Sequence, residues 1–85
     1  MVKFINDDHK EMHEVLLSSG FTFEDKIIFS ETGGYSSILC YTNINLDLSV
    51  FFDSHVNFVA SRFISSDICC PLDGLSFKEV TAYFT

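Results

Sequence analysis

The sequence is short of several features that would indicate a function directly. It has no tryptophan, a single proline, and only five basic residues against twelve acidic ones, which leaves a formal net charge of -7. No apolar run approaches the roughly 18 residues of a membrane-spanning helix. The first ten residues also lack the apolar core of a signal peptide. We therefore expect an intracellular, cytoplasmic protein that does not insert into a membrane.

The shortage of positive charge also limits the classes of partner. A net charge of -7 repels phosphate backbones and anionic lipid surfaces, which disfavours direct binding to nucleic acid or to a membrane. The same charge favours a protein partner with a basic surface. That surface can be one that normally binds nucleic acid.

The cysteines do not form a recognisable framework. There are three, Cys40, Cys69 and Cys70, and two of them are adjacent, which is poor geometry for disulfide pairing. The C-x-x-C spacing that wraps a metal ion is absent. We expect reduced thiols that pack as small apolar side chains.

The sequence does contain enough apolar material for one core. Of its 85 residues, 47% are apolar, and ten are phenylalanine. A chain of this length is too short to form two separate cores. We expect a single compact domain over residues 1–85.

A first helix is predicted over residues 6–19. Apolar and charged side chains alternate there with helical periodicity, and Gly20 follows as a stop signal. Asp8 and Glu11 fit an aspartate version of the capping box, and early acidic residues suit the positive end of the helix dipole.

Four segments in the middle of the chain are predicted as strands. Apolar and polar residues alternate in the first and third, and periodicity does not settle which face of the fourth is buried. The four segments cover residues 21–30, 35–44, 46–53 and 56–65. Gly33 and Gly34 supply the turn between the first two. The pattern places Ile27 and Leu46 on the apolar side of their strands.

A second helix is predicted over residues 76–84, because Ser76 and Glu79 fit the capping box. A fifth strand is the alternative for this segment. The order α-β-β-β-β-α with short connections predicts an α+β fold. We expect a two-layer domain in which both helices cover one face of an antiparallel four-stranded meander.

His9 and His13 raise the question of a metal site. They lie four residues apart in the predicted helix, where imidazoles on adjacent turns can chelate an ion. The metalloprotease pattern is H-E-x-x-H, but these residues read HKEMH, so Lys10 stands where the general base belongs. We expect no metal or other cofactor, and we place both histidines at the boundary of the buried face, with one ring nitrogen in water. A small metal-binding domain that uses His9 and His13 remains an alternative.

No other motif indicates catalysis. The glycines of residues 32–37 lack the downstream lysine of a phosphate-binding loop and precede a strand. The serines do not occur in a G-x-S-x-G motif. No catalytic residue can be named, so we expect that the protein is not an enzyme.

Acidic side chains are the remaining candidates for a binding site. Those predicted on the outer face of the first helix and on the third strand are Asp7, Asp8, Glu11, Glu14, Asp47 and Asp53. Such a surface can steer encounter with a basic partner and exclude wrong ones. Apolar residues of the sheet, such as Ile28, Phe51 and Phe63, would add an anchor.

The resulting hypothesis is an acidic binding protein that modulates or inhibits its partner. In size, charge and architecture the chain resembles small phage and mobile-element inhibitors of host nucleases and CRISPR complexes, and this resemblance implies an anti-defence role. The alternative is a structural module that forms a homodimer or larger oligomer through its sheet face or an edge strand.

Overall fold

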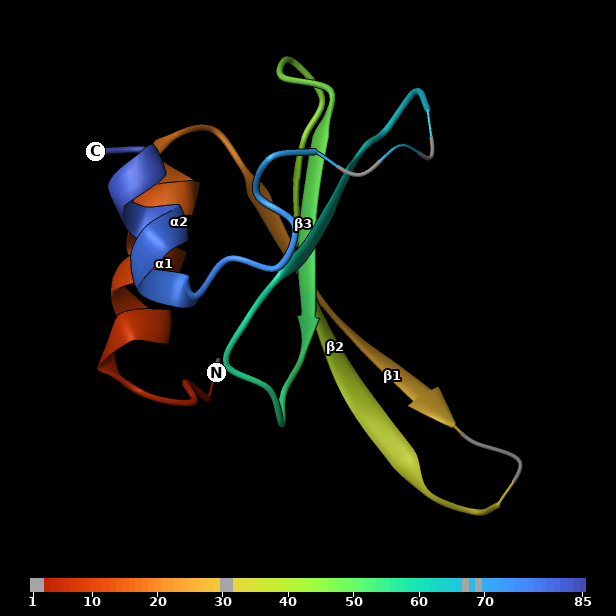
Figure 1. Ribbon diagram of the computed structural model, residues 1–85. Helices are drawn as coiled ribbons and strands as arrows, with labels where there is room; N and C mark the ends of the chain where they lie inside the picture. Colours follow the sequence, from red (N-terminus) through yellow and green to blue (C-terminus); the bar gives the residue numbers. More distant parts are fainter. Residues whose placement is uncertain (1–2, 30–31, 67, 69) are drawn as a thin grey trace.

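Two helices and four strands make up the fold (Figure 1). The computed structural model describes residues 3–29, 32–66, 68 and 70–85, except for the side chains of residues 28, 29, 35 and 36. The elements are α1 (Asp7–Ser18), β1 (Thr22–Phe29), β2 (Tyr35–Asn43), β3 (Leu48–Asp53), β4 (Ala60–Phe63) and α2 (Phe77–Tyr83). The predicted α+β class and element order are confirmed. Within the residues described, neither helix combines the length and apolar character needed to cross a membrane.

The strands form an antiparallel meander in the order β1-β2-β3-β4. Their register aligns Phe23, Tyr41, Val50 and Ser61 in one row across the sheet. Because strand side chains alternate between faces, the whole row points to the same side. Both helices cover that side, as predicted (Figure 1). Tyr41 is therefore placed near the middle of the covered face.

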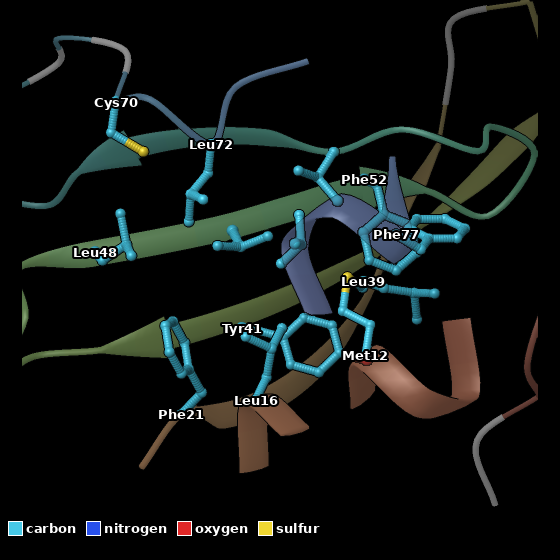
Figure 2. Packing of buried hydrophobic residues seen from close by; sticks show 13 residues of the cluster. Met12, Leu16, Phe21, Leu39, Tyr41, Leu48, Phe52, Cys70, Leu72 and Phe77 are labelled. Carbon is cyan, nitrogen blue, oxygen red and sulfur yellow. The ribbon is translucent and has the colours of Figure 1, made fainter. Parts of the chain in front are cut away.

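The core lies between the covered face of the sheet and the two helices (Figure 2). Helix α1 contributes Met12 and Leu16, helix α2 contributes Phe77 and Val80, and all four are almost completely buried. Burial of each such side chain is worth about 2 kcal/mol. The two helices also pack against each other, which fixes α1 over the sheet.

Helix α2 begins where the capping box predicts. Ser76 Oγ accepts a hydrogen bond from the Glu79 N–H, and Glu79 Oε1 accepts one from the Ser76 N–H, both at 3.2 Å. The fifth-strand alternative is wrong, because the only strand-like pairing here is an isolated bridge between Phe58 and Ser76, and helix follows directly.

The predicted cap of α1 is wrong. The capping residue is Asn6, whose side chain accepts a hydrogen bond from the His9 N–H at 2.9 Å. Asp8 lies one residue inside the helix, in the first turn, where its charge suits the helix dipole. Asn6 therefore sets the start of the helix two residues earlier than Asp8 would.

Two side chains expected on the apolar side of their strands face solvent instead. Ile27 is 60% exposed because the far half of the β1–β2 hairpin extends beyond the helical layer (Figure 1). Leu46 is 51% exposed because residues 44–47 form the turn that precedes β3.

The fourth strand is also shorter than predicted. Val59 leaves the sheet to pair with the segment before α2, and its N–H donates to Leu75 O at 2.9 Å.

Asn43 ties the end of α1 to the β2–β3 turn. Its side chain is buried, its Nδ2 donates to Ser19 O at 3.1 Å, and its Oδ1 accepts from the Leu46 N–H at 3.1 Å.

We expect Asn43→Ala to lower the free energy of unfolding by about 2 kcal/mol, because two backbone groups lose their partner. Urea unfolding measures this loss. Asn45→Ala, at an exposed position of the same turn, should cost less than about 0.5 kcal/mol, and equal losses would contradict the role of Asn43.

Candidate functional site

Helix α1 brings two histidines to Tyr41 in the interior. His9 and His13 lie one helical turn apart on the side that faces the sheet. His9 is completely buried and His13 is half-buried. Tyr41, from the middle of β2, is also completely buried, and its hydroxyl meets both imidazole rings.

The three side chains form a chain of hydrogen bonds. Tyr41 Oη lies 2.7 Å from His13 Nδ1 and 3.5 Å from His9 Nε2. On its other side, His9 Nδ1 accepts a hydrogen bond from the Ile5 N–H at 3.0 Å. Because a backbone donor occupies that lone pair, the neutral His9 ring carries its proton on Nε2 and donates to Tyr41. The Tyr41 hydroxyl is then free to donate to His13 Nδ1.

This direction of donation makes a specific prediction for NMR. Both His9 and His13 are expected to be neutral Nε2–H tautomers near neutral pH, because each Nδ1 accepts a hydrogen bond. Long-range proton–nitrogen correlation spectra distinguish the two tautomers for each ring. A protonated Nδ1 on either ring would contradict the hydrogen-bond chain. The exposed His55 provides a reference signal in the same sample.

Aromatic rings enclose the two imidazoles. The Phe4 ring centroid lies 5.1 Å from that of His9 and 5.1 Å from that of His13. Phe52 lies 5.0 Å from His9, and Phe23 lies 5.1 Å from His13. All four contacts are edge-to-face, the arrangement that aromatic quadrupoles favour. The surroundings of the histidines are therefore largely apolar.

The apolar surroundings keep this cluster uncharged at neutral pH. Burial, together with the proximity of His13, lowers the pKa of His9 from 6.5 to about 4. Burial also lowers the pKa of His13, against the opposing effect of the Glu14 carboxylate. Burial raises the pKa of the Tyr41 hydroxyl. The arrangement has the chemistry of a neutral interior network, since burial disfavours the charged form of all three groups.

The expected position of His9 at the boundary of the buried face is wrong. The residues before α1 fold back over it, so that the Phe4 ring and the Ile5 N–H cover it. The metal candidates His9 and His13 do lie side by side. Within the described parts of the chain, however, no three His, Cys, Asp or Glu side chains come together as a metal site would require.

The cysteines are separated in the fold. Cys70 is buried, with its Sγ 2.7 Å from Ser61 Oγ. Cys40 is half-buried on the sheet face away from the helices, and burial raises the pKa of its thiol. Cys69 lies outside the described residues.

The four acids predicted on the first helix do lie together on the exposed face of α1. They are Asp7, Asp8, Glu11 and Glu14. Spacings of three and four residues make them neighbours on the helix surface, and Lys10 is the one basic residue of α1. None of these carboxylates forms an ion pair with a described residue. We refer to these four residues as the acidic face.

Asp47 and Asp53 are not part of the acidic face. They flank β3 at opposite ends, about 20 Å apart for six residues of extended chain. Both carboxylates already accept hydrogen bonds within the protein. Asp47 accepts from the Ser65 N–H at 2.9 Å and from the Ser65 hydroxyl, and Asp53 accepts from the His55 N–H at 2.9 Å. The six acids predicted as one set therefore occupy three separate places.

The open face of the sheet is less acidic than α1. Phe51 is half-buried there, with the Arg62 guanidinium carbon 5.4 Å from its ring centroid, and Lys26 is close by on the same face. The apolar anchor predicted for this sheet is not assembled as expected, because Phe63 packs against the core on the other face. The side chain of Ile28 lies outside the described part.

Sequence reasoning missed Tyr41 and an uncharged cavity beside Leu46 and Tyr83. A buried tyrosine hydroxyl needs a hydrogen-bond partner, but burial can be predicted only when the face on which the tyrosine lies is known. The sequence of the second strand did not settle the face of Tyr41. The cavity gave no local signal, because its walls come from separate parts of the chain.

No protein-family model matches the chain, and no curated protein or solved structure shows significant similarity to it. The function is therefore inferred from the side chains and their arrangement.

Proposed function

We propose that the protein is a non-enzymatic cytoplasmic binding protein that docks its acidic face on a basic surface of a partner protein. The contact is made by the exposed carboxylates of α1. Where the basic surface normally holds nucleic acid, the docked protein blocks access to it and thereby inhibits the partner. This is the mode of action that the resemblance to phage and mobile-element inhibitors implies.

The observation that carries this proposal is the separation of neutral and charged side chains on α1. The inner face holds His9 and His13, which are neutral and hydrogen-bonded. The outer face presents four carboxylates that have no ion-pair partner among the described residues. Because the helix is packed on the sheet and on α2, its backbone keeps these charges on one side of the molecule. Unpaired charge of one sign on one side of a protein favours rapid and selective docking on a complementary surface.

Matched charge reversals test the proposal. A partner is first captured from a lysate of the native host and identified by mass spectrometry, and its affinity is then measured with purified components. We expect Glu11→Lys to weaken binding roughly tenfold, because it places a positive charge in the middle of the acidic face. Glu24→Lys makes the same change of charge at an exposed position on β1, and should alter the affinity less than about twofold.

Salt dependence provides the second readout. Affinity should fall as ionic strength rises, because screening weakens attraction between surface charges. Equal losses of affinity in Glu11→Lys and Glu24→Lys would show that binding depends on the total charge of the protein and not on the acidic face. Unchanged affinity in both variants would remove the acidic face from the contact.

A homo-oligomeric structural module is the second candidate, and the edge strand β1 favours it. This strand is eight residues long, lies at the edge of the sheet, and has Ile27 60% exposed. Unpaired backbone groups at such an edge can pair with a second copy of the chain. Size-exclusion chromatography with light scattering tests this candidate, and a strictly monomeric protein at micromolar concentration would contradict it.

A further inference from the structure

Exposed apolar side chains gather at one end of the molecule. Eight large apolar residues are exposed in the described part of the chain. Two of them, Leu46 in the β2–β3 turn and Tyr83 at the end of α2, line one cavity. The Ile64 N–H donates to Asp47 O at 2.8 Å, which holds the chain after β4 against this turn. The turn and the end of α2 lie toward the upper end of Figure 1. We refer to Leu46 and Tyr83 as the apolar end.

Leu46 and Tyr83 border a cavity of about 480 Å³. Leu46 and Tyr83 stand at its mouth, since both are more than half exposed. Leu48 and Leu72 are buried and form its floor, and Figure 2 shows them close to Cys70 at one end of the core. No charged residue of the described chain lines this cavity. It also lacks the convergent polar groups that orient a small polar ligand.

We propose that this cavity receives an apolar anchor from a basic helical segment of the protein partner. The inference rests on the proposed function and assigns a second contact to the same partner. The cavity has room for one or two bulky apolar side chains, and central pockets of this kind supply most of the binding energy in protein interfaces. A helix with leucine or phenylalanine on one face can insert such side chains.

Charge decides between a foreign partner and a second copy of this chain. Each copy carries a net charge of -7, so two copies repel each other as they approach. At the mouth of the cavity, Asp47 directly follows Leu46 in the chain. An acidic residue beside an uncharged cavity, on a chain of net negative charge, complements a segment in which lysine or arginine flanks the apolar anchors.

Two synthetic peptides test this assignment. One is a helical peptide with leucine along one face and lysine elsewhere, and the other has serine in place of every leucine and therefore the same charge. Titration of the labelled protein, followed by NMR, should show shifts at Leu46, Leu72 and Tyr83 with the leucine peptide only. Leu46→Ser and Tyr83→Ser should each weaken that peptide at least tenfold. Ile27→Ser removes an equally exposed apolar residue from the β1–β2 hairpin and should leave the affinity unchanged.

The outcomes separate this inference from the proposed function. If both peptides bind equally and both are weakened by Glu11→Lys, the acidic face stands and the apolar anchor is overturned. If the leucine peptide binds the cavity and Glu11→Lys has no effect on it, the anchor stands and the role of the acidic face fails. Absence of binding, or shifts confined to the open face of the sheet, overturns the inference. If the protein forms a dimer and Leu46→Ser dissociates it, the occupant of the cavity is a second copy of this chain and not a foreign partner.

Discussion

Lowering the pH from neutral to about 4 is expected to reduce the free energy of unfolding by about 3 kcal/mol through His9 alone. In the unfolded chain His9 takes up a proton below pH 6.5, whereas in the folded protein burial and the proximity of His13 delay this to about pH 4. Between these two values the unfolded state binds more protons. The contribution of His9 is therefore fully present above pH 6.5 and is lost as the pH falls through this range.

Two histidine variants isolate this effect. His9→Asn keeps an acceptor near the Ile5 N–H but cannot take up a proton, so the fall in stability between pH 6.5 and about 4 should become shallower. His55→Asn removes an exposed histidine and should keep the slope of the wild type. Urea unfolding at a series of pH values measures both slopes. A slope that His9→Asn leaves unchanged would assign the acid sensitivity to other groups.

The order of elements could be predicted because each element has a local cause. Ser76 and Glu79 form both bonds of the capping box, and Gly20 takes a positive φ of 93° directly after α1. Short connections between strands lead to a meander. The exposed acids of α1 could also be predicted, because helical periodicity alone decides which side chains face solvent.

The capping residue of α1, though not the start of the helix, was predicted wrongly because two residues compete for the same role. Asn6 and Asp8 are both good capping residues. Capping by Asn6 places His9 at the third helical position, where its N–H meets the Asn6 side chain and its Nδ1 accepts the Ile5 N–H. The histidine thus completes an arrangement close to a capping box. The capping-box pattern that was applied to Asp8 and Glu11 requires an acidic or amide side chain at the third helical position, so it does not recognise a histidine there.

The depth of His9 and the grouping of the acids depend on tertiary structure. Periodicity gives the direction of His9 around the helix axis, but its burial results from Phe4 folding back and from β2 placing Tyr41 opposite. Strand alternation places Asp47 and Asp53 on the same side of β3, but six residues of extended chain keep them about 20 Å apart. Asp53 binds the nearby His55 N–H, whereas Asp47 binds the Ser65 N–H, which only the fold brings close.

Removing the Tyr41 hydroxyl is expected to lower the free energy of unfolding by about 3 kcal/mol. Tyr41→Phe keeps the ring, whose centroid lies 5.0 Å from that of Phe23 and 6.2 Å from that of Phe52, so apolar packing is retained. The lost oxygen accepts from His9 Nε2 and donates to His13 Nδ1. Its removal leaves the buried His9 donor and the half-buried His13 acceptor without partners, and the loss of a buried partner costs about 1–3 kcal/mol.

The response of His13 distinguishes this mechanism from a general loss of packing. Tyr83→Phe removes a hydroxyl that is largely exposed, so it should change the stability by less than about 0.5 kcal/mol. In Tyr41→Phe, the Nδ1 lone pair of His13 no longer accepts the hydroxyl proton, so the pKa of His13 should rise above its wild-type value in an NMR titration. If Tyr41→Phe matched Tyr83→Phe in stability and left that pKa unchanged, the hydroxyl would not link the two histidines. A rise in the pKa together with the larger loss would show that the Tyr41 hydroxyl holds His13 neutral and thereby keeps charge out of the inner face of α1.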